Sequence, residues 1–262
     1  MKKPKSDYAI QTVTNALRLL EVFRDEQEVG VAELSRRLGL HKNNVFRLLA
    51  TLEEAGYIEQ SPVSERYRLG VSTLEIGHSY LRSRELLARA RPVVVELSGV
   101  TEESAHLATL HGFDVVHVDG AAPSRLVLTG LRVGRRLPVH CTALGKVLLG
   151  CGPEAQRELF DRALASNGGL ERRTPRTIVD SHKFFEHIRS VAVHGFALDV
   201  GECEVGLVCV AAPVHDASEQ VIAALSVSAP SFRASEEDLI DRLCPAVTSA
   251  AERLSRELGY GA

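Results

Sequence analysis

The first seventy residues carry short apolar stripes separated by polar breaks, and the apolar positions recur at the spacing of amphipathic helices. Gly39 follows the second stripe and suits the left-handed conformation that ends a helix. A turn-rich stretch around Pro62 then lies between two short apolar segments, as in a small hairpin. The predicted elements are helices at 16–23, 31–38 and 41–55 and strands at 57–60 and 67–69.

The rest of the chain mixes helical and alternating patterns. Helical spacing continues from residue 71 to about 100, with a break expected near Pro92 because proline cannot continue the hydrogen-bond ladder. Beyond Ser104, short strands occur in groups with helices between and after them, which favours an α+β domain with a mostly antiparallel sheet. The predicted strands cover 105–110, 115–118, 126–128, 206–210 and 221–228, and the predicted helices cover 143–149, 156–165, 183–194 and 235–258.

The order helix, short turn, helix and hairpin is typical of a winged helix-turn-helix, whose last helix enters the major groove of DNA. Asn matches adenine, and Arg or Lys matches guanine, so a polar start of the third helix can read bases. The alternative is a plain solvent-facing turn in which Asn43 or Asn44 caps the helix. We expect the whole arrangement to bind double-stranded DNA. The candidate base-reading residues are His41, Lys42, Asn43, Asn44 and Arg47, and the candidate phosphate contacts are Arg36, Arg37, Arg66 and Arg68.

Composition places these elements in an ordinary globular protein of 262 residues, with 45% hydrophobic and 25% charged residues. The net charge is −3 and the charges of residues 1–80 cancel, so a DNA site must be a local patch. The five scattered cysteines form no Cys-x-x-Cys pair, which is typical of reduced thiols in a cytoplasmic protein. No apolar run is long enough to suggest a membrane span, and no membrane partner is expected.

From about Ala16 to Gly259, the sequence resembles the IclR family of bacterial transcriptional regulators. The resemblance implies an N-terminal winged helix-turn-helix (1–70), a linker helix (71–88) and a GAF-like α/β domain for effector binding and oligomerisation (89–262). It also implies a repressor or activator that binds a pseudo-palindromic operator as a homodimer or homotetramer, with a small organic acid or related catabolite as effector. Blocks that carry it are 31–40, 47–57, 66–70, 137–149, 206–214 and 221–230.

The family's effector pocket, carried over by position, falls on residues whose chemistry suits an acid. Ser226 and Ser228 are two apart in a predicted strand, so both hydroxyls point to one face, which Cys209 could share from a neighbouring strand. The backbone N–H groups at Ala143 and Leu144 start a helix and can hold a carboxylate. Asp199 would accept a hydrogen bond from a ligand hydroxyl. Each of these residues also has a purely structural explanation, as a small packing residue or a turn cap.

Two rival functions stay open at this point. A zinc-responsive regulator would need several nitrogen, sulfur and oxygen ligands to converge, although their spacing forms no compact motif. An enzyme is less favoured, since neither a Gly-x-Ser-x-Gly elbow nor a His-Glu-x-x-His motif occurs. We therefore expect no catalytic residues, no resident metal and no cofactor. The candidate zinc ligands are His140, Cys141, Asp199, Cys203 and Cys209.

Overall fold

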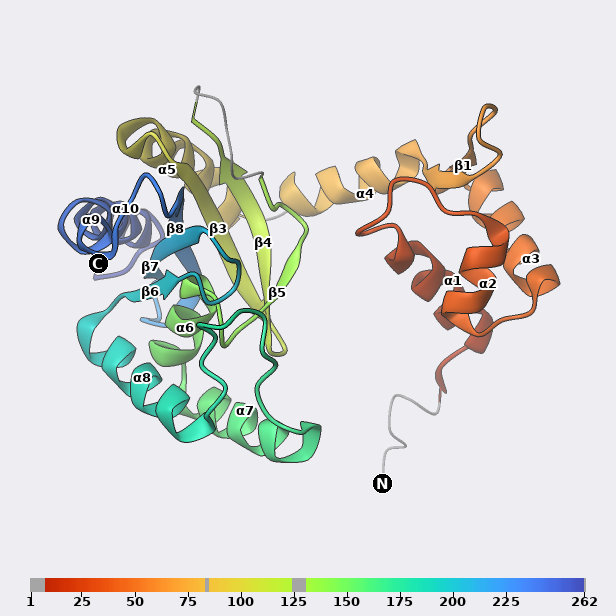
Figure 1. Ribbon diagram of the computed structural model, residues 1–262. Helices are drawn as coiled ribbons and strands as arrows, with labels where there is room; N and C mark the ends of the chain where they lie inside the picture. Colours follow the sequence, from red (N-terminus) through yellow and green to blue (C-terminus); the bar gives the residue numbers. More distant parts are fainter. Residues whose placement is uncertain (1–7, 83–84, 124–130, 262) are drawn as a thin grey trace. The chain divides into compact units, whose positions relative to one another are not determined.

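The computed structural model describes residues 8–82, 85–123 and 131–261 (Figure 1). The chain forms two compact units, Met1–Arg84 and Glu85–Ala262. The first unit contains helices α1 (Gln11–Val22), α2 (Val31–Leu38), α3 (Lys42–Glu54) and α4 (Val71–Arg82), and strands β1 (Ile58–Gln60) and β2 (Tyr67–Leu69).

Helices α1, α2 and α3 of the first unit pack around a common apolar core. Leu19, Leu34 and Leu49 from the three helices are fully buried there. Gly39 has φ +68° and ends α2 in the left-handed conformation, as expected. Strands β1 and β2 pair as an antiparallel hairpin, and Tyr67 of β2 also bridges to Val29. The predicted winged helix-turn-helix is therefore confirmed.

In the described part of the second unit, six strands form one antiparallel sheet in the order β5-β4-β3-β8-β7-β6. The predicted α+β class with an antiparallel sheet is confirmed. Its strands are β3 (Ser104–His111), β4 (Asp114–Ala121), β5 (Arg136–Pro138), β6 (Ala197–Val200), β7 (Leu207–His215) and β8 (Val221–Pro230). Its helices are α5 (Glu85–Thr101), α6 (Ala143–Gly150), α7 (Glu154–Asn167), α8 (Ser181–His194), α9 (Glu236–Asp238) and α10 (Cys244–Glu257), and a π-helical turn (Leu239–Leu243) joins the last two.

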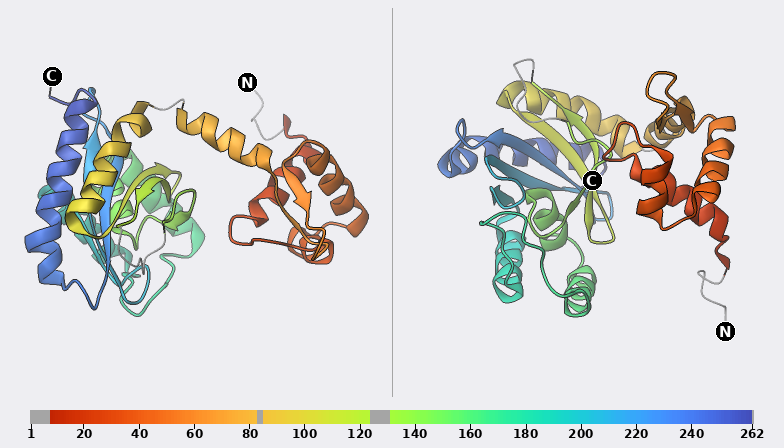
Figure 2. Two further views of the ribbon diagram at one scale, coloured as in Figure 1. Left: turned by 90° about the horizontal axis from the view of Figure 1, so that it is seen from above. Right: turned by 45° about the vertical axis from the view of Figure 1, so that its right-hand side comes forward.

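The two faces of this sheet differ in chemistry. Helices α5 and α10 cover one face, with Val210, Leu225 and Val227 buried against them (Figure 2). Helix α6 covers the other face, where small apolar residues such as Ala211 and Ala224 alternate with polar ones. The alternation of side chains along each strand thus separates an apolar core from a mixed face that can hold a ligand.

Helix α6 lies close to the segment that precedes it because Gly145 has no side chain. A Cβ atom at Gly145 would lie 2.3 Å from the Val139 carbonyl oxygen and 2.6 Å from its Cα. The Thr142 hydroxyl caps the helix by accepting a hydrogen bond from the Gly145 N–H at 3.1 Å. This tight start fixes the position of the first helical turn over the sheet.

Some predicted elements differ from the structure. The break expected at Pro92 was wrong: α5 runs through it, because Pro92 faces solvent while Val93 and Val94 pack against the sheet. Strands β5 and β6 were not predicted, since three or four residues give little periodic signal. The strand expected at 126–128 lies outside the described residues. Residues 83 and 84 do too, so a continuous linker helix over 71–88 stays a prediction.

We predict that Gly145→Ala destabilises the second unit by about 3 kcal/mol, because backbone atoms would have to move to admit the new methyl group. The matched control is Gly99→Ala in α5, where a Cβ meets nothing within 4 Å. That change should raise stability by about 0.5–1 kcal/mol through helix propensity. Chemical unfolding of both variants measures the difference, and equal effects would contradict the proposed role of the close approach.

Candidate nucleic-acid interface and ligand pocket

The outward side of α3 carries the residues predicted to read DNA. His41 occupies the N-cap position, and its side chain makes no capping hydrogen bond. Val45, Leu48 and Leu49 are buried on the opposite side. The exposed side therefore presents imidazole, ammonium, amide and guanidinium groups to a partner. It comprises His41, Lys42, Asn43, Asn44 and Arg47.

Sequence reasoning missed one further residue on this helix. Phe46 is 58% exposed between Val45 and Arg47. An exposed aromatic ring can make apolar contact with a thymine methyl group. The helical spacing of Val45, Leu48 and Leu49 already placed Phe46 off the buried stripe, so the signal was present in the sequence.

The arginines of α2 differ in how far acidic neighbours engage them. The Arg37 guanidinium lies 2.6 Å from Glu26 and 2.5 Å from Glu33. Its hydrogen bond lowers the pKa of Glu33 below the usual value. The Arg36 side chain, in contrast, is 79% exposed, and its guanidinium lies 4.0 Å from the Glu33 carboxylate, too far for a hydrogen bond. Arg36 is therefore the more available of the two for a phosphate group.

The hairpin arginines also have protein partners. Arg66 donates to the backbone carbonyl of Glu28 at 2.9 Å. Arg68 donates to the Glu59 carboxylate across the hairpin at 2.6 Å. Both side chains remain about half exposed, so these bonds can exchange for phosphate contacts at little cost.

In the second unit, the predicted effector residues gather beneath the start of α6. Ser228 on β8 pairs with Cys209 on β7, which pairs in turn with Asp199 on β6. The Cys209 thiol donates to the Ser228 hydroxyl at 3.2 Å. Ala143 and Leu144 lie above them in the first turn of α6, whose N–H groups have no acceptor within the helix. All six predicted residues, including Ser226, line one cavity of about 20 Å³, room for roughly one water molecule.

The same cavity has walls that were not among the predicted effector residues. They come from β4, β5 and β7, from the segments before β5 and α6, and from the turn between β6 and β7. Sequence spacing alone did not place these segments around one cavity. These additional lining residues are His117, Arg132, Leu137, Thr142, Cys203 and Leu207.

Asp199 holds the turn that closes one end of the cavity. Its Oδ1 accepts hydrogen bonds from the backbone N–H groups of Glu202, at 2.7 Å, and Cys203, at 3.3 Å. Burial raises the pKa of Asp199 to about 6, although these bonds oppose the shift. The carboxyl group is thus poised to change charge near neutral pH.

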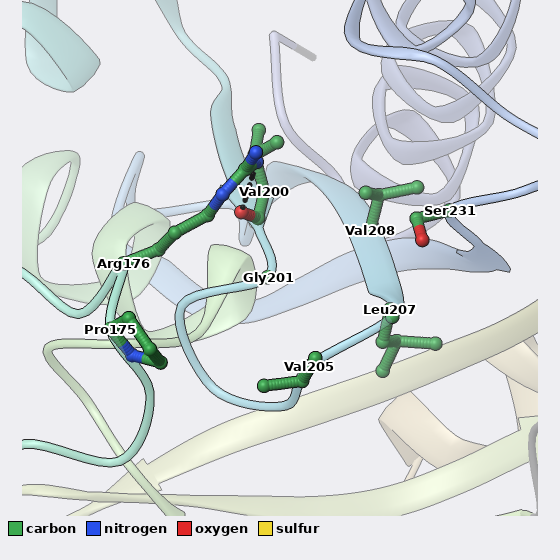
Figure 3. Close-up of a pocket in the computed structure, with 9 residues that line it drawn as sticks. Pro175, Arg176, Val200, Gly201, Val205, Leu207, Val208 and Ser231 are labelled. Atoms are coloured by element: carbon green, nitrogen blue, oxygen red, sulfur yellow. Dashed lines mark hydrogen bonds between the residues drawn. The ribbon is translucent and has the colours of Figure 1, made fainter.

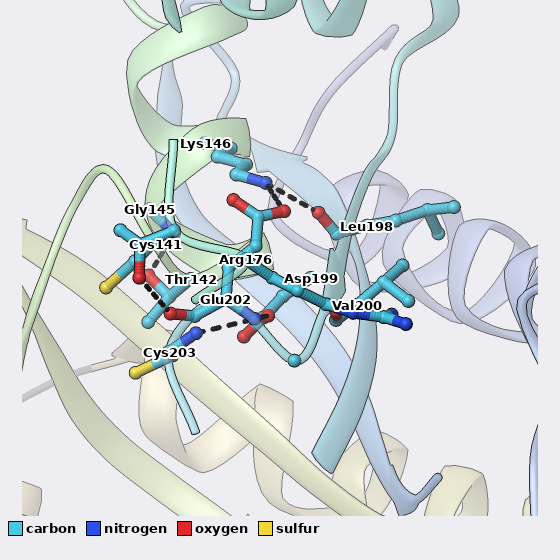
Figure 4. A network of polar contacts seen from close by, with 12 residues as sticks. Cys141, Thr142, Gly145, Lys146, Arg176, Leu198, Asp199, Val200, Glu202 and Cys203 are labelled. Atoms are coloured by element: carbon cyan, nitrogen blue, oxygen red, sulfur yellow. Dashed lines mark hydrogen bonds and ion pairs between the residues drawn. The ribbon is translucent and has the colours of Figure 1, made fainter. Parts of the chain in front are cut away.

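A buried ion pair lies behind this turn (Figure 4). Lys146 of α6 is completely buried, and its Nζ bonds the Glu202 carboxylate and donates to the Leu198 carbonyl at 2.9 Å. Thr177 donates to the backbone carbonyl of Glu202 at 2.7 Å. Burial raises the pKa of Glu202, while the positive charge of Lys146 opposes the rise. The pair ties α6 to the turn that borders the cavity.

The candidate zinc ligands do not form a metal site in the described part of the chain. No group of three or more His, Cys, Asp or Glu side chains gathers there with suitable geometry. His140 Nε2 bonds the Glu171 carbonyl at 2.8 Å, and Cys209 bonds Ser228. Burial raises the pKa of Cys209, which disfavours the thiolate that binds zinc. This geometry gives the zinc alternative no support.

A second, larger hollow of about 360 Å³ lies beside the turn between β6 and β7 (Figure 3). Arg176 and Ser231 supply the polar side chains of its described lining. Arg176 donates to the Val200 carbonyl at 3.2 Å, and Val205 is 76% exposed at the rim. It lacks the converging polar groups of the cavity under α6, which is the better candidate for a specific ligand.

No helix in the described residues is long and apolar enough to cross a membrane.

Comparisons with known proteins cover both units. The family model described as "IclR helix-turn-helix domain" matches residues 12–62, and "Bacterial transcriptional regulator IclR C-terminal" matches residues 78–256. The chain is 35% identical to the HTH-type transcriptional regulator XynR of Escherichia coli, over 97% of this chain and 99% of that one. It is 34% identical to the regulator KdgR of the same species, over 99% and 95%. These relatives are named as regulators and not as enzymes.

Solved structures show the same fold. A transcriptional regulator from Rhodococcus sp. aligns with TM-score 0.81 and 32% identity, covering 95% of this chain and 98% of that one. A Microbacterium hydrocarbonoxydans homologue, solved in complex with 4-hydroxybenzoate, aligns with TM-score 0.77 and 24% identity, over 94% and 98%.

We predict that the free energy of unfolding of Asp199→Asn, relative to that of the wild type, increases by about 1 kcal/mol as the pH rises from 5 to 7.5. With a folded pKa of about 6, the buried carboxyl is largely protonated at pH 5 and ionised at pH 7.5. The unfolded carboxyl is ionised throughout, so the wild type loses stability over this window and the amide does not. Urea unfolding at pH 5 and pH 7.5 measures the free energy of unfolding of both proteins, and Asp161→Asn, a change at an exposed position, serves as control. A constant difference would contradict the raised pKa.

Proposed function

The chain belongs to the IclR family of bacterial transcriptional regulators, and from this premise we propose that it binds a specific DNA operator through α3. The observation that carries the proposal is the exposed polar start of α3 on a packed helix-turn-helix. Asn43 and Asn44 are suited to adenine, and Lys42 and Arg47 to guanine. His41 and Phe46 add contacts at the edge of the same surface.

Phosphate binding in this proposal begins with Arg36, the least engaged arginine of α2. Arg37, Arg66 and Arg68 contribute once phosphate groups replace their present protein partners. Because the charges of residues 1–80 cancel, attraction to DNA comes from this local arrangement and not from a broad positive field.

We propose further that the protein acts as a homodimer or homotetramer on a pseudo-palindromic site. Ile10, the N-cap residue of α1, and Val13 and Leu17 within the helix follow helical spacing and are 67%, 52% and 58% exposed. Leu74 of α4 is 61% exposed in the same unit. Apolar side chains exposed in a row are typical of an interface, and a two-fold interface would place two reading helices on related half-sites.

The effector in this proposal is a small organic acid bound under α6. The N–H groups of Ala143 and Leu144 suit its carboxylate, and the Ser226 and Ser228 hydroxyls suit its oxygen atoms. The fold accepts such a molecule in the Microbacterium homologue. Since the cavity holds only about 20 Å³, an acid must select a wider state of the pocket. The acid thus binds the wider state of the pocket in preference to the narrow one, and such a preference is what regulation requires. We propose that the segment 71–88 couples this change to DNA binding.

We predict that Asn44→Ala and Arg47→Ala each weaken specific binding by about 1–3 kcal/mol. The measurement is a titrated gel shift with the DNA upstream of the protein's own gene and excess nonspecific competitor. Arg162→Ala, an exposed arginine of α7, serves as control and should bind like the wild type. Wild-type affinity in both α3 variants would reject base reading by these residues. If the wild-type protein gives no competitor-resistant shift with this upstream DNA, the operator must be sought elsewhere in the genome.

We predict that Arg36→Ala lowers the slope of log K against log salt concentration by about one. Arg37→Ala should lower it less, because the Arg37 charge is already balanced by two carboxylates. Fluorescence anisotropy with labelled operator across a salt series tests this pair. A larger effect at Arg37 than at Arg36 would show that the DNA complex rearranges the ion pairs.

A further inference from the structure

Two histidines lie side by side on the cavity face of the sheet, outside the predicted effector set. His106 of β3 is in register with Ser226 of β8, and His117 comes from the neighbouring strand β4. Their rings meet edge to face with centroids 5.4 Å apart. Both side chains are almost fully buried, at 1% and 3% exposure. His117 lines the cavity together with Ser226 and Ser228.

The imidazole nitrogens of this pair are poorly satisfied. His106 Nδ1, His106 Nε2 and His117 Nδ1 have no hydrogen-bond partner among the residues that the structure describes. A buried polar atom without a partner destabilises a protein, and such atoms are rare in folded proteins. Three of them in two adjacent rings, of which the His117 ring lines the cavity, indicate that something else completes their bonding.

Burial keeps both rings uncharged at neutral pH. It lowers the pKa of His106 to about 3 and that of His117 to about 4. The positive charges nearby, including that of Arg132, act in the same direction. A neutral imidazole has one N–H donor and one nitrogen acceptor. His106 therefore presents one unsatisfied donor and one unsatisfied acceptor.

This combination distinguishes between oxygen groups. A carboxylate only accepts hydrogen bonds, so it can satisfy the N–H of an imidazole but not the acceptor nitrogen. A hydroxyl group both donates and accepts, so one hydroxyl can bond a donor nitrogen of one ring and an acceptor nitrogen of the other, whereas the two nitrogens of a single ring point apart. The first turn of α6 offers only N–H donors, which suit the carboxylate.

We infer that His106 and His117 form a subsite for a hydroxyl group, so that the effector is a small hydroxy acid. Its carboxylate binds at Ala143 and Leu144, and its hydroxyl lies at the imidazole pair one strand beyond Ser226. This inference rests on the proposed function, since it assumes that a small acid binds under α6. It adds the chemical class of that acid and the residues that select it.

The test uses the full-length protein and pairs of acids that differ in one hydroxyl: propanoate with lactate, and benzoate with 4-hydroxybenzoate. Isothermal titration at pH 7.5 should show at least about tenfold tighter binding of a hydroxylated member, because a site built to bond a hydroxyl strongly rejects the analogue that lacks it. His106→Leu and His117→Phe should reduce this preference to about twofold or less.

The matched control is His187→Phe. His187 of α8 also has a buried nitrogen without a partner in the described structure, and burial lowers its pKa to about 4. It belongs to α8 and not to the sheet face that carries Ser226. Its replacement should leave the preference for hydroxylated acids at the wild-type value, and loss of the preference in this variant would overturn the assignment to the His106 pair.

A second readout needs no ligand. If the His106 nitrogens are unsatisfied in the free protein, His106→Leu should raise its melting temperature, and a lowered melting temperature would overturn the inference. Acids that bind equally well with and without the hydroxyl would also overturn it and leave the proposed function intact. If none of these acids binds or alters operator binding, the proposal of a small-acid sensor fails, and the inference fails with it.

Discussion

The start of α6 can lie close to the segment that precedes it only because Gly145 has no side chain, and the shape of the cavity under α6 depends on that approach. The first helical turn brings unpaired N–H groups over a sheet face that carries serine, cysteine and histidine side chains. One turn later, Lys146 forms a buried ion pair with Glu202. Removing one partner of such a pair costs about 3–5 kcal/mol because the other charge is left buried without a partner, so Lys146 and Glu202 depend on each other.

These contacts explain why the cavity is nearly closed. Asp199 and Lys146 fix the turn at 201–206 from two sides, through hydrogen bonds to its backbone and through Glu202. Of the buried side chains with an unsatisfied polar atom in the described structure, His117 lines this cavity and His106 lies next to it on the same sheet. A ligand that supplies their missing bonds can offset the cost of widening the pocket, whereas a plain apolar molecule of the same size cannot.

Much of the fold could be predicted from the sequence, because its helices and long strands repeat apolar residues at regular spacing. The exposed side of α3 followed from the stripe of Val45, Leu48 and Leu49, and the shared face of Ser226 and Ser228 followed from strand alternation. Lys146 with Glu202, and His106 with His117, could not be predicted. Lys146 and Glu202 join a helix to a distant turn, and the contact between His106 and His117 depends on the register of β3 and β4, which shifts between Leu107 and Ala108. The helix break predicted at Pro92 was wrong because tertiary packing of α5 outweighs the loss of one backbone hydrogen bond.

The arrangement of charge in the first unit bears on how such a protein can bind DNA. Arg37, Arg66 and Arg68 already bond acidic side chains or backbone carbonyls, so each phosphate contact replaces an existing one. The net gain per contact is then small, and a single reading helix with few free cations binds weakly. Two helices on one oligomer bind the second half-site at a high effective concentration. Specific binding would then depend on the spacing of the two helices, and a ligand that changes this spacing could regulate binding without touching DNA.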